Sequence, residues 1–135
     1  MVSAKINDLI GIPFLLRGRD IDQGVDCWGL AAHALRMESI EIMDAWKNIA
    51  DAWDDGDSLD HLPEPDGWEE IDPQEATRLD VIIIGRRAAA THVGIVGEDG
   101  WMLHTSARDK GQSELVQLRR MIRAGLVHSA WRSTC

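Results

Sequence analysis

The sequence predicts an α+β fold, in which N-terminal helices pack on an antiparallel β-sheet. Apolar residues recur at three- and four-residue intervals before residue 55, a spacing typical of amphipathic helices. After residue 80 they occur in short runs that are typical of strands. The chain has 135 residues, of which 44% are hydrophobic and 27% charged, a composition that indicates a folded globular protein. We therefore expect a single domain over residues 1–135.

Two helices are expected in the N-terminal part. The first covers residues 27–37, and Asp26 stands directly before it, where a carboxylate can accept hydrogen bonds from the free amides of the first turn. The second lies between residues 42 and 53, where Ile42, Trp46, Ile49 and Trp53 recur at helical intervals. Tryptophans at this spacing are more often core residues than a platform for a ligand, so we expect them to be buried.

An acidic stretch separates these helices from the strands. Residues 51–72 contain ten Asp and Glu residues and no Lys or Arg, together with two prolines and two glycines. The sequence Asp54-Asp55-Gly56-Asp57 supplies oxygen ligands that calcium prefers, but the alternating carboxylates and the final Glu of an EF-hand are absent. We expect a solvated acidic loop at about 51–72.

Five strands and one short helix are expected after this loop. The strands are predicted at residues 81–84, 92–97, 101–105, 114–118 and 126–131, and a helical turn at 119–124. The run at 81–84 consists of one valine and three isoleucines, so it should be fully buried. Because the helices come first and the strands follow, an antiparallel sheet is favoured.

A tight hairpin joins the second and third of these strands. Its loop, Glu98-Asp99-Gly100, fits a type I turn followed by a left-handed glycine. This loop length places His92 and His104 on the same face as diagonal neighbours, within reach of one another. A loop of two or four residues would put them on opposite faces. The sequence therefore favours a convergent pair of histidines.

Cys27 is the candidate nucleophile. It falls at the expected start of the first helix, where free amides and the helix dipole stabilise a thiolate. Arg17 and Arg19 add positive charge nearby in the sequence. We therefore expect the pKa of Cys27 to lie below its usual value of about 8.5. The alternative is a buried cysteine that acts only as a small apolar residue.

Cys27, His92 and His104 together could form the triad of a cysteine hydrolase. Cys27 would attack an acyl carbon, while His92 would hold the thiolate as an ion pair and later protonate the leaving amine. His104 would fix the tautomer of His92, and the backbone amide of Cys27 would donate to the oxyanion. The same three side chains are acceptable zinc ligands, so a catalytic zinc site with three ligands and a water stays open as an alternative.

These motifs resemble those of the NlpC/P60 family of cysteine peptidases. The similarity to the family's nucleophile motif lies in residues 11–14 (GIPF) and 24–30 (GVDCWGL), and the similarity to its two histidine motifs in residues 91–96 (THVGIV) and 101–106 (WMLHTS). Leu79-Asp80-Val81 stands where the family strand usually begins with Gly-Asp-Val. The resemblance covers residues 8–132. A tryptophan directly after the cysteine is similar to the phage and prophage tail-tip branch of the family.

The resemblance implies a papain-like α+β fold and a Cys–His–His triad, with Cys27 as nucleophile, His92 as base and His104 as orienting residue. It also implies cleavage of peptidoglycan stem peptides, often at the bond from D-γ-glutamate to a diamino acid. We expect no cofactor and no metal. Asp26 matches a position that helps to hold the free amine of the substrate.

The sequence departs from the family pattern at three positions near the expected site. Phe14 stands where the family commonly has Tyr, Arg17 replaces one of two paired glycines, and Trp28 replaces a usual small Ser. We expect these three residues, together with Asp26, to shape the substrate site.

The charge balance limits the expected partners. With 14 Lys and Arg against 23 Asp and Glu, the net charge is −9, so neither nucleic acid nor an anionic membrane is expected as a partner. No apolar run is long enough to span a bilayer, and the first residues do not resemble a signal peptide. We expect synthesis in the cytoplasm, with the virion tail as a further location. The expected partners are a peptidoglycan stem peptide and other phage tail proteins. In a non-enzymatic alternative, the same fold serves as a structural tail-tip or assembly protein with weak or no catalysis.

Overall fold

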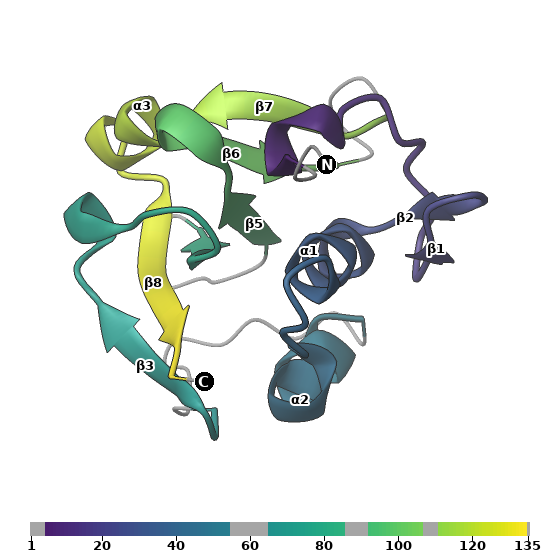
Figure 1. The fold of residues 1–135 in the computed structure, drawn as a ribbon, viewed down its shortest axis with the longest axis horizontal. Helices are drawn as coiled ribbons and strands as arrows, with labels where there is room; N and C mark the ends of the chain where they lie inside the picture. Colours follow the sequence, from purple (N-terminus) through teal and green to yellow (C-terminus); the bar gives the residue numbers. More distant parts are fainter. Residues whose placement is uncertain (1–4, 55–64, 86–91, 107–110, 135) are drawn as a thin grey trace.

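The computed structural model describes residues 5–54, 65–85, 92–106 and 111–134 (Figure 1). The helices are α1 (Cys27–Arg36), α2 (Met43–Asp54) and α3 (Leu118–Arg123), with the short 3-10 turns η1 (Ile6–Asp8), η2 (Pro73–Glu75) and η3 (Glu98–Gly100). A small antiparallel pair is formed by β1 (Arg19–Asp20) and β2 (Gly24–Val25). The remaining strands are β3 (Trp68–Ile71), β4 (Val81–Ile84), β5 (His92–Val96), β6 (Trp101–His104), β7 (Glu114–Gln117) and β8 (Val127–Ser133).

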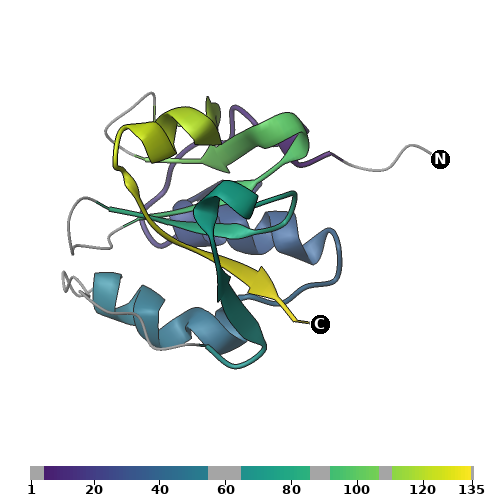
Figure 2. The ribbon, with the colours of Figure 1, turned by 90° about the vertical axis from the view of Figure 1, so that its left-hand side faces the viewer.

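These six strands form one antiparallel sheet in the order β3-β8-β4-β5-β6-β7. α1 and α2 pack on one face, where they share a core with Val81 and Ile83 of β4. α3 packs on the opposite face, against Ile82 of the same strand. Figure 2 shows α2 and α3 on opposite sides of the molecule. The predicted α+β fold is confirmed, and β4 is buried along its whole length as expected.

The first helix begins where the sequence predicts. Asp26 has an extended backbone, and its side chain accepts a hydrogen bond from the Gly29 N–H at 2.8 Å, so it caps the helix. A side chain at Gly29 would collide with the carbonyl oxygen of Gly18. The glycine therefore lets the segment before β1 lie directly on the first turn of α1.

Tryptophans form the centre of the larger core. Trp46 of α2 is fully buried, and its ring centre lies 5.8 Å from that of Trp28 and 5.5 Å from that of Trp131. Trp68 of β3 completes the cluster, with its ring centre 5.8 Å from that of Trp46. The predicted burial is confirmed for Trp46, whereas the side chain of Trp53 lies outside the described residues.

The expected acidic loop at 51–72 is shorter than the sequence predicts. α2 continues to Asp54, and β3 occupies residues 68–71 as an edge strand paired with β8. The sequence of β3 does not show the apolar pattern of a strand, because a single buried tryptophan is followed by the exposed Glu69 and Glu70. The strand also pairs with β8, which is more than fifty residues away in the sequence. Residues 55–64, which carry most of the calcium-like sequence, lie outside the described residues.

The hairpin of β5 and β6 has the predicted register. Ile95 lies opposite Leu103, and the Gly97 N–H donates to the Trp101 carbonyl at 2.7 Å. The turn differs in detail from the predicted one, because Asp99 as well as the following glycine has a left-handed backbone, with φ values of 58° and 79°. Asp tolerates this conformation better than most residues, so the loop keeps its length and the register is unchanged.

The turn of this hairpin is fixed to two other parts of the chain, one of which contacts a third. The Glu98 carboxylate accepts hydrogen bonds from the backbone amides of Ile6 and Asn7, at 3.3 and 3.0 Å, and from the Arg78 guanidinium at 2.7 Å. The Asn7 side chain bonds both backbone groups of Glu98 at 3.0 Å. Arg78 also forms an ion pair with Glu38, which follows α1.

Candidate active site

Cys27 is the first residue of α1, and its side chain meets the beginning of β5. The Cys27 sulfur accepts hydrogen bonds from the backbone amides of Val93 and Trp28. Ile95 of β5 lies opposite Leu103 of β6, so the next hydrogen-bonded pair towards the histidines would be Val93 with Thr105. The pairing of β5 with β6 ends before this pair. The N–H of Val93 is therefore free to donate its hydrogen bond to the Cys27 sulfur. Because His92 directly precedes Val93, its backbone lies next to the sulfur.

The thiol of Cys27 does not have the low pKa that the sequence suggests. Burial raises the pKa of Cys27 to about 12, and the negative charge of Asp26 acts in the same direction. The hydrogen bonds from Val93 and Trp28 and the charge of Arg19 oppose this shift but are weaker. The prediction of a resting thiolate is therefore wrong. It failed because the position at a helix start is visible in the sequence, whereas burial against β5 is not.

His92 and His104 meet, as the hairpin register predicts. Nε2 of His92 lies 3.1 Å from Nδ1 of His104, and the two rings are nearly perpendicular, at 79°. Burial, together with the charge interaction with the nearby His104, lowers the pKa of His92 to about 4, so the ring is neutral at pH 7. A neutral imidazole can accept a proton, as a general base must. The resting site thus consists of a thiol and a neutral imidazole, and not of the expected ion pair.

A carboxylate that the sequence analysis missed lies beside this pair. Glu114 of β7 is directly opposite His104 in the sheet, and its Oε1 lies 3.2 Å from Nε2 of His104. His104 is only 8% exposed. The sequence does not predict this contact because it does not fix the register between β6 and β7. No turn motif between residues 105 and 113 indicates which residue of β7 faces His104.

Asp26 is buried and already has two partners. Its Oδ1 accepts the capping bond from Gly29 and a charged hydrogen bond from Nη1 of Arg19 at 2.6 Å. The cap role is confirmed. Contact with a substrate amine stays a prediction, and the Arg19 guanidinium shows that this carboxylate can pair with a cation.

Phe14 and Arg17 lie on the segment that leads to β1. Phe14 is half-buried, bridges to Val25 and donates its N–H to the Gly111 carbonyl at 2.8 Å. Arg17 is exposed and has a left-handed backbone, with a φ of 60°. This conformation favours glycine, so Arg17 keeps the backbone expected of the glycine that it replaces. Contact of either residue with a substrate stays a prediction.

Trp28 does not line the site. It is 1% exposed and packs on Trp46 in the larger core. Neighbouring residues of a helix point about 100° apart, so Cys27 faces β5 while Trp28 turns inward. Contact of Trp28 with a substrate stays a prediction that its burial does not favour, since the side chain packs against α2 instead.

Metal and membrane sites receive no support from the described residues. No group of three His, Cys, Asp or Glu side chains among them is placed to hold a metal ion. His92 and His104 direct their ring nitrogens at one another, which leaves no shared point for the zinc ion considered above. None of the helices in the described part of the chain is long and apolar enough to cross a membrane.

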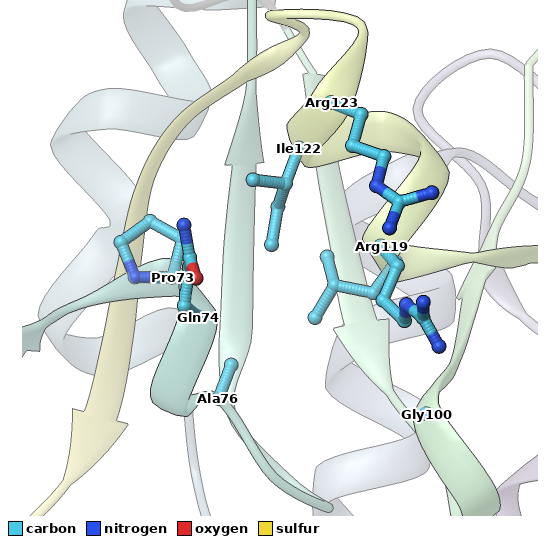
Figure 3. Close-up of a pocket in the computed structure, with 8 residues that line it drawn as sticks. Pro73, Gln74, Ala76, Gly100, Arg119, Ile122 and Arg123 are labelled. Atoms are coloured by element: carbon cyan, nitrogen blue, oxygen red, sulfur yellow. The ribbon is translucent and has the colours of Figure 1, made fainter.

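A groove of about 270 Å³ lies at the other end of the hairpin (Figure 3). It runs between η2 and α3, and it is lined by Pro73, Gln74, Ala76, Gly100, Leu118, Arg119, Ile122 and Arg123. Gly100 belongs to the hairpin turn, whereas the histidines lie where the hairpin is open. The groove is therefore separate from the site around Cys27.

Comparison with known proteins supports the fold described above. The model of the NlpC/P60 family matches residues 11–129. NlpC2 from Trichomonas vaginalis has a similar structure, with a TM-score of 0.65 and 18% identity over 94% of this chain and 45% of that one. The P60 domain of an antigen from M. avium subspecies paratuberculosis gives a TM-score of 0.61 and 19% identity over 94% of this chain and 88% of that one. An NLP/P60 family lipoprotein-like protein from Staphylococcus aureus gives 0.60 and 19%, over 96% and 39%.

The chain spans less than half the length of the two T. vaginalis proteins that it matches, NlpC1 and NlpC2. The comparison with curated proteins gave no match. At these identities the solved structures show the fold alone. The family model, however, covers most of the chain and includes the segments with Cys27, His92 and His104. This protein therefore belongs to the NlpC/P60 family.

Proposed function

We propose that this protein is a cysteine hydrolase that cleaves peptidoglycan stem peptides, with Cys27 as nucleophile, His92 as general base and His104 as orienting residue. NlpC/P60 proteins are generally cysteine peptidases or amidases that act on peptidoglycan. The observation that carries the proposal is the 3.1 Å contact between the two imidazoles at the strand end that meets the Cys27 sulfur.

The reaction would begin from neutral side chains. At pH 7 Cys27 is a thiol and His92 an imidazole, because burial raises the pKa of the first and lowers that of the second. His92 takes the thiol proton as the sulfur attacks the carbonyl carbon. The two charges then appear together, and their attraction offsets part of the cost of burying each one. Since Nε2 of His92 is directed at His104, Nδ1 is the nitrogen that takes this proton.

The backbone amide of Cys27 would stabilise the oxyanion. It lies in the first turn of α1, and it has no acceptor within the part of the chain that the structure describes. When the tetrahedral intermediate collapses, His92 gives its proton to the leaving amine and the acyl group stays on the sulfur. Water then attacks the thioester, His92 receives the water's proton, and the acid leaves as the thiol is restored.

The bond proposed is the amide from D-γ-glutamate to a diamino acid, with Asp26 as the partner of the substrate's free amine. Arg19 already occupies Oδ1 of this carboxylate. A substrate ammonium group would therefore share or replace the Arg19 contact.

Digestion of purified peptidoglycan, with mass spectrometry of the released fragments, tests this proposal. We expect the wild type to release stem-peptide fragments whose masses identify the cleaved amide. His33→Gln, which changes a histidine of α1 outside the site, should release the same fragments. Cys27→Ala and His92→Gln should release none. Equal release by Cys27→Ala and the wild type would remove Cys27 from the mechanism.

We also propose a second function, in which the chain is a component of a phage or prophage tail tip with weak or no turnover. The pKa of about 12 for Cys27 favours it, because thiolate is scarce at neutral pH. The tryptophan after the cysteine supports the tail-tip assignment through its similarity to that branch. Absence of fragments from the wild type, together with recovery of the protein in purified virions, would support this function. Release of fragments that depends on Cys27 would contradict weak turnover, and failure to recover the protein in virions would contradict the tail location.

A further inference from the structure

We propose that Glu114 is a positioning residue that sets the direction of hydrogen bonding through His104 and His92. The inference rests on the proposed function, because its consequence is to leave the correct nitrogen of His92 free for the Cys27 proton. The side-chain contact of Glu114 is with His104 and not with the cysteine. Glu114 acts through the two histidines.

The carboxylate of Glu114 is held against His104 by the sheet itself. The two residues are directly opposite one another on β6 and β7, where cross-strand side chains are close neighbours. Oε1 of Glu114 lies 3.2 Å from Nε2 of His104, with the two side chains 26% and 9% exposed.

The geometry leaves one polar atom in need of this carboxylate. Nε2 of His104 is buried, and no atom of the described residues forms a well-aligned hydrogen bond with it. The 3.2 Å contact is within bonding distance but off the line of the N–H. A small rotation of the Glu114 side chain, which is partly exposed, would align the two groups.

The tautomers of His104 and His92 follow from which atoms can donate and which can accept a hydrogen bond. An ionised carboxylate only accepts hydrogen bonds, so Nε2 of His104 must carry a proton. Nδ1 of a neutral His104 is then a lone pair, and it accepts the hydrogen bond from Nε2 of His92 across 3.1 Å. Nδ1 of His92 is in turn left without a proton, which is the state that a base needs.

The opposite direction would disable the site. If Nδ1 of His104 donated to His92, the proton of a neutral His92 would lie on Nδ1, and this nitrogen could not receive the thiol proton. Nε2 of His104 would then direct a lone pair at the negative Glu114 carboxylate, an unfavourable contact in a buried place. Two hydrogen-bonded histidines alone allow either ring to be the donor. The Glu114 carboxylate therefore determines which of them donates.

Long-range ¹H–¹⁵N NMR of histidine-labelled protein at pH 7 tests this inference without any substrate. We expect His92 and His104 of the wild type to be protonated on Nε2 and unprotonated on Nδ1. Glu114→Gln keeps the size of the side chain but offers both a donor and an acceptor, so each ring should show a mixture of tautomers. The matched control is Glu70→Gln, which removes the same charge from an exposed position on β3 at the far edge of the sheet.

Peptidoglycan digestion supplies the second readout. Glu114→Gln should lower kcat about 10- to 100-fold with KM within about twofold of the wild type, as expected for the loss of a group that orients a catalytic side chain. Glu114→Asp, which keeps the charge, should recover part of the loss, and thermal unfolding should show that both variants fold. Protonation of His104 on Nδ1 in the wild type, or unchanged tautomers in Glu114→Gln, would overturn the role of Glu114. Tautomers that shift as expected in a protein without hydrolysis would instead overturn the proposed function and leave the role of Glu114 intact.

Discussion

Alkylation of Cys27 should reveal a thiol that is almost fully protonated at neutral pH. Burial raises its pKa to about 12, about three pH units above the ordinary range of about 8.5 to 9.0. Each unit lowers the thiolate fraction about tenfold, so the folded protein should hold about 1000-fold less thiolate at pH 7 than an unperturbed cysteine. Because only the thiolate attacks iodoacetamide, the rate should also rise about tenfold per pH unit up to at least pH 10.

The assay follows the peptide that contains Cys27 by mass spectrometry, at pH values from 6 to 10. The control is the same protein unfolded in urea, where the half-buried Cys27 becomes fully solvated. Restricted access to the sulfur slows the reaction equally at every pH, so the slope of rate against pH decides the question. An inflection below pH 8, or faster reaction in the folded protein than in the unfolded one at pH 6, would refute the assignment of a neutral resting thiol.

Two further predictions concern stability, measured by urea unfolding. The pKa of His92 falls from 6.5 to about 4 on burial, so the unfolded chain takes up the proton first, and stability present above pH 6.5 is lost as the pH falls towards 4. Between pH 7 and 4 the wild type should lose roughly 3 kcal/mol more than His92→Gln, and equal losses would contradict this shift. Asp80→Ala should cost about 3 kcal/mol, because this buried carboxylate accepts two hydrogen bonds from Arg132 and one from a backbone amide. Glu41→Ala removes a similar but exposed pair with Arg36 and should cost less than about 1 kcal/mol, so equal costs would show that burial is not decisive.

Local signals predicted much of the fold. The start of α1 follows from an aspartate before an apolar stripe, and the hairpin register follows from a loop of three residues. Both depend on contacts between residues close in sequence. β3 could not be predicted in this way, because its two apolar residues, Trp68 and Ile71, are separated by two exposed glutamates, and Trp68 is buried against Trp46 of α2.

In the candidate site, too, contacts between residues close in sequence could be predicted, whereas contacts between distant elements could not. The contact of His92 with His104 is a consequence of the hairpin alone, so the sequence predicts it. The pKa of Cys27 depends on packing between α1 and β5, and the partner of His104 depends on the register of β7. Neither is a local property. The burial of Trp28 shows the same limit, since residues next to a nucleophile can point away from the site.

The hydrogen bonds of Glu98 hold the turn of the β5–β6 hairpin in place, whereas β5 and β6 are not paired with one another at the histidine end. The contacts of Glu98 with Ile6, Asn7 and Arg78 immobilise the turn, whereas pairing of β5 with β6 stops short of the histidines. Any separation of the two strands would therefore change the distance between the imidazoles before it disturbed the turn. In the proposed mechanism, proton transfer would therefore depend on how closely β5 and β6 approach one another at the histidines.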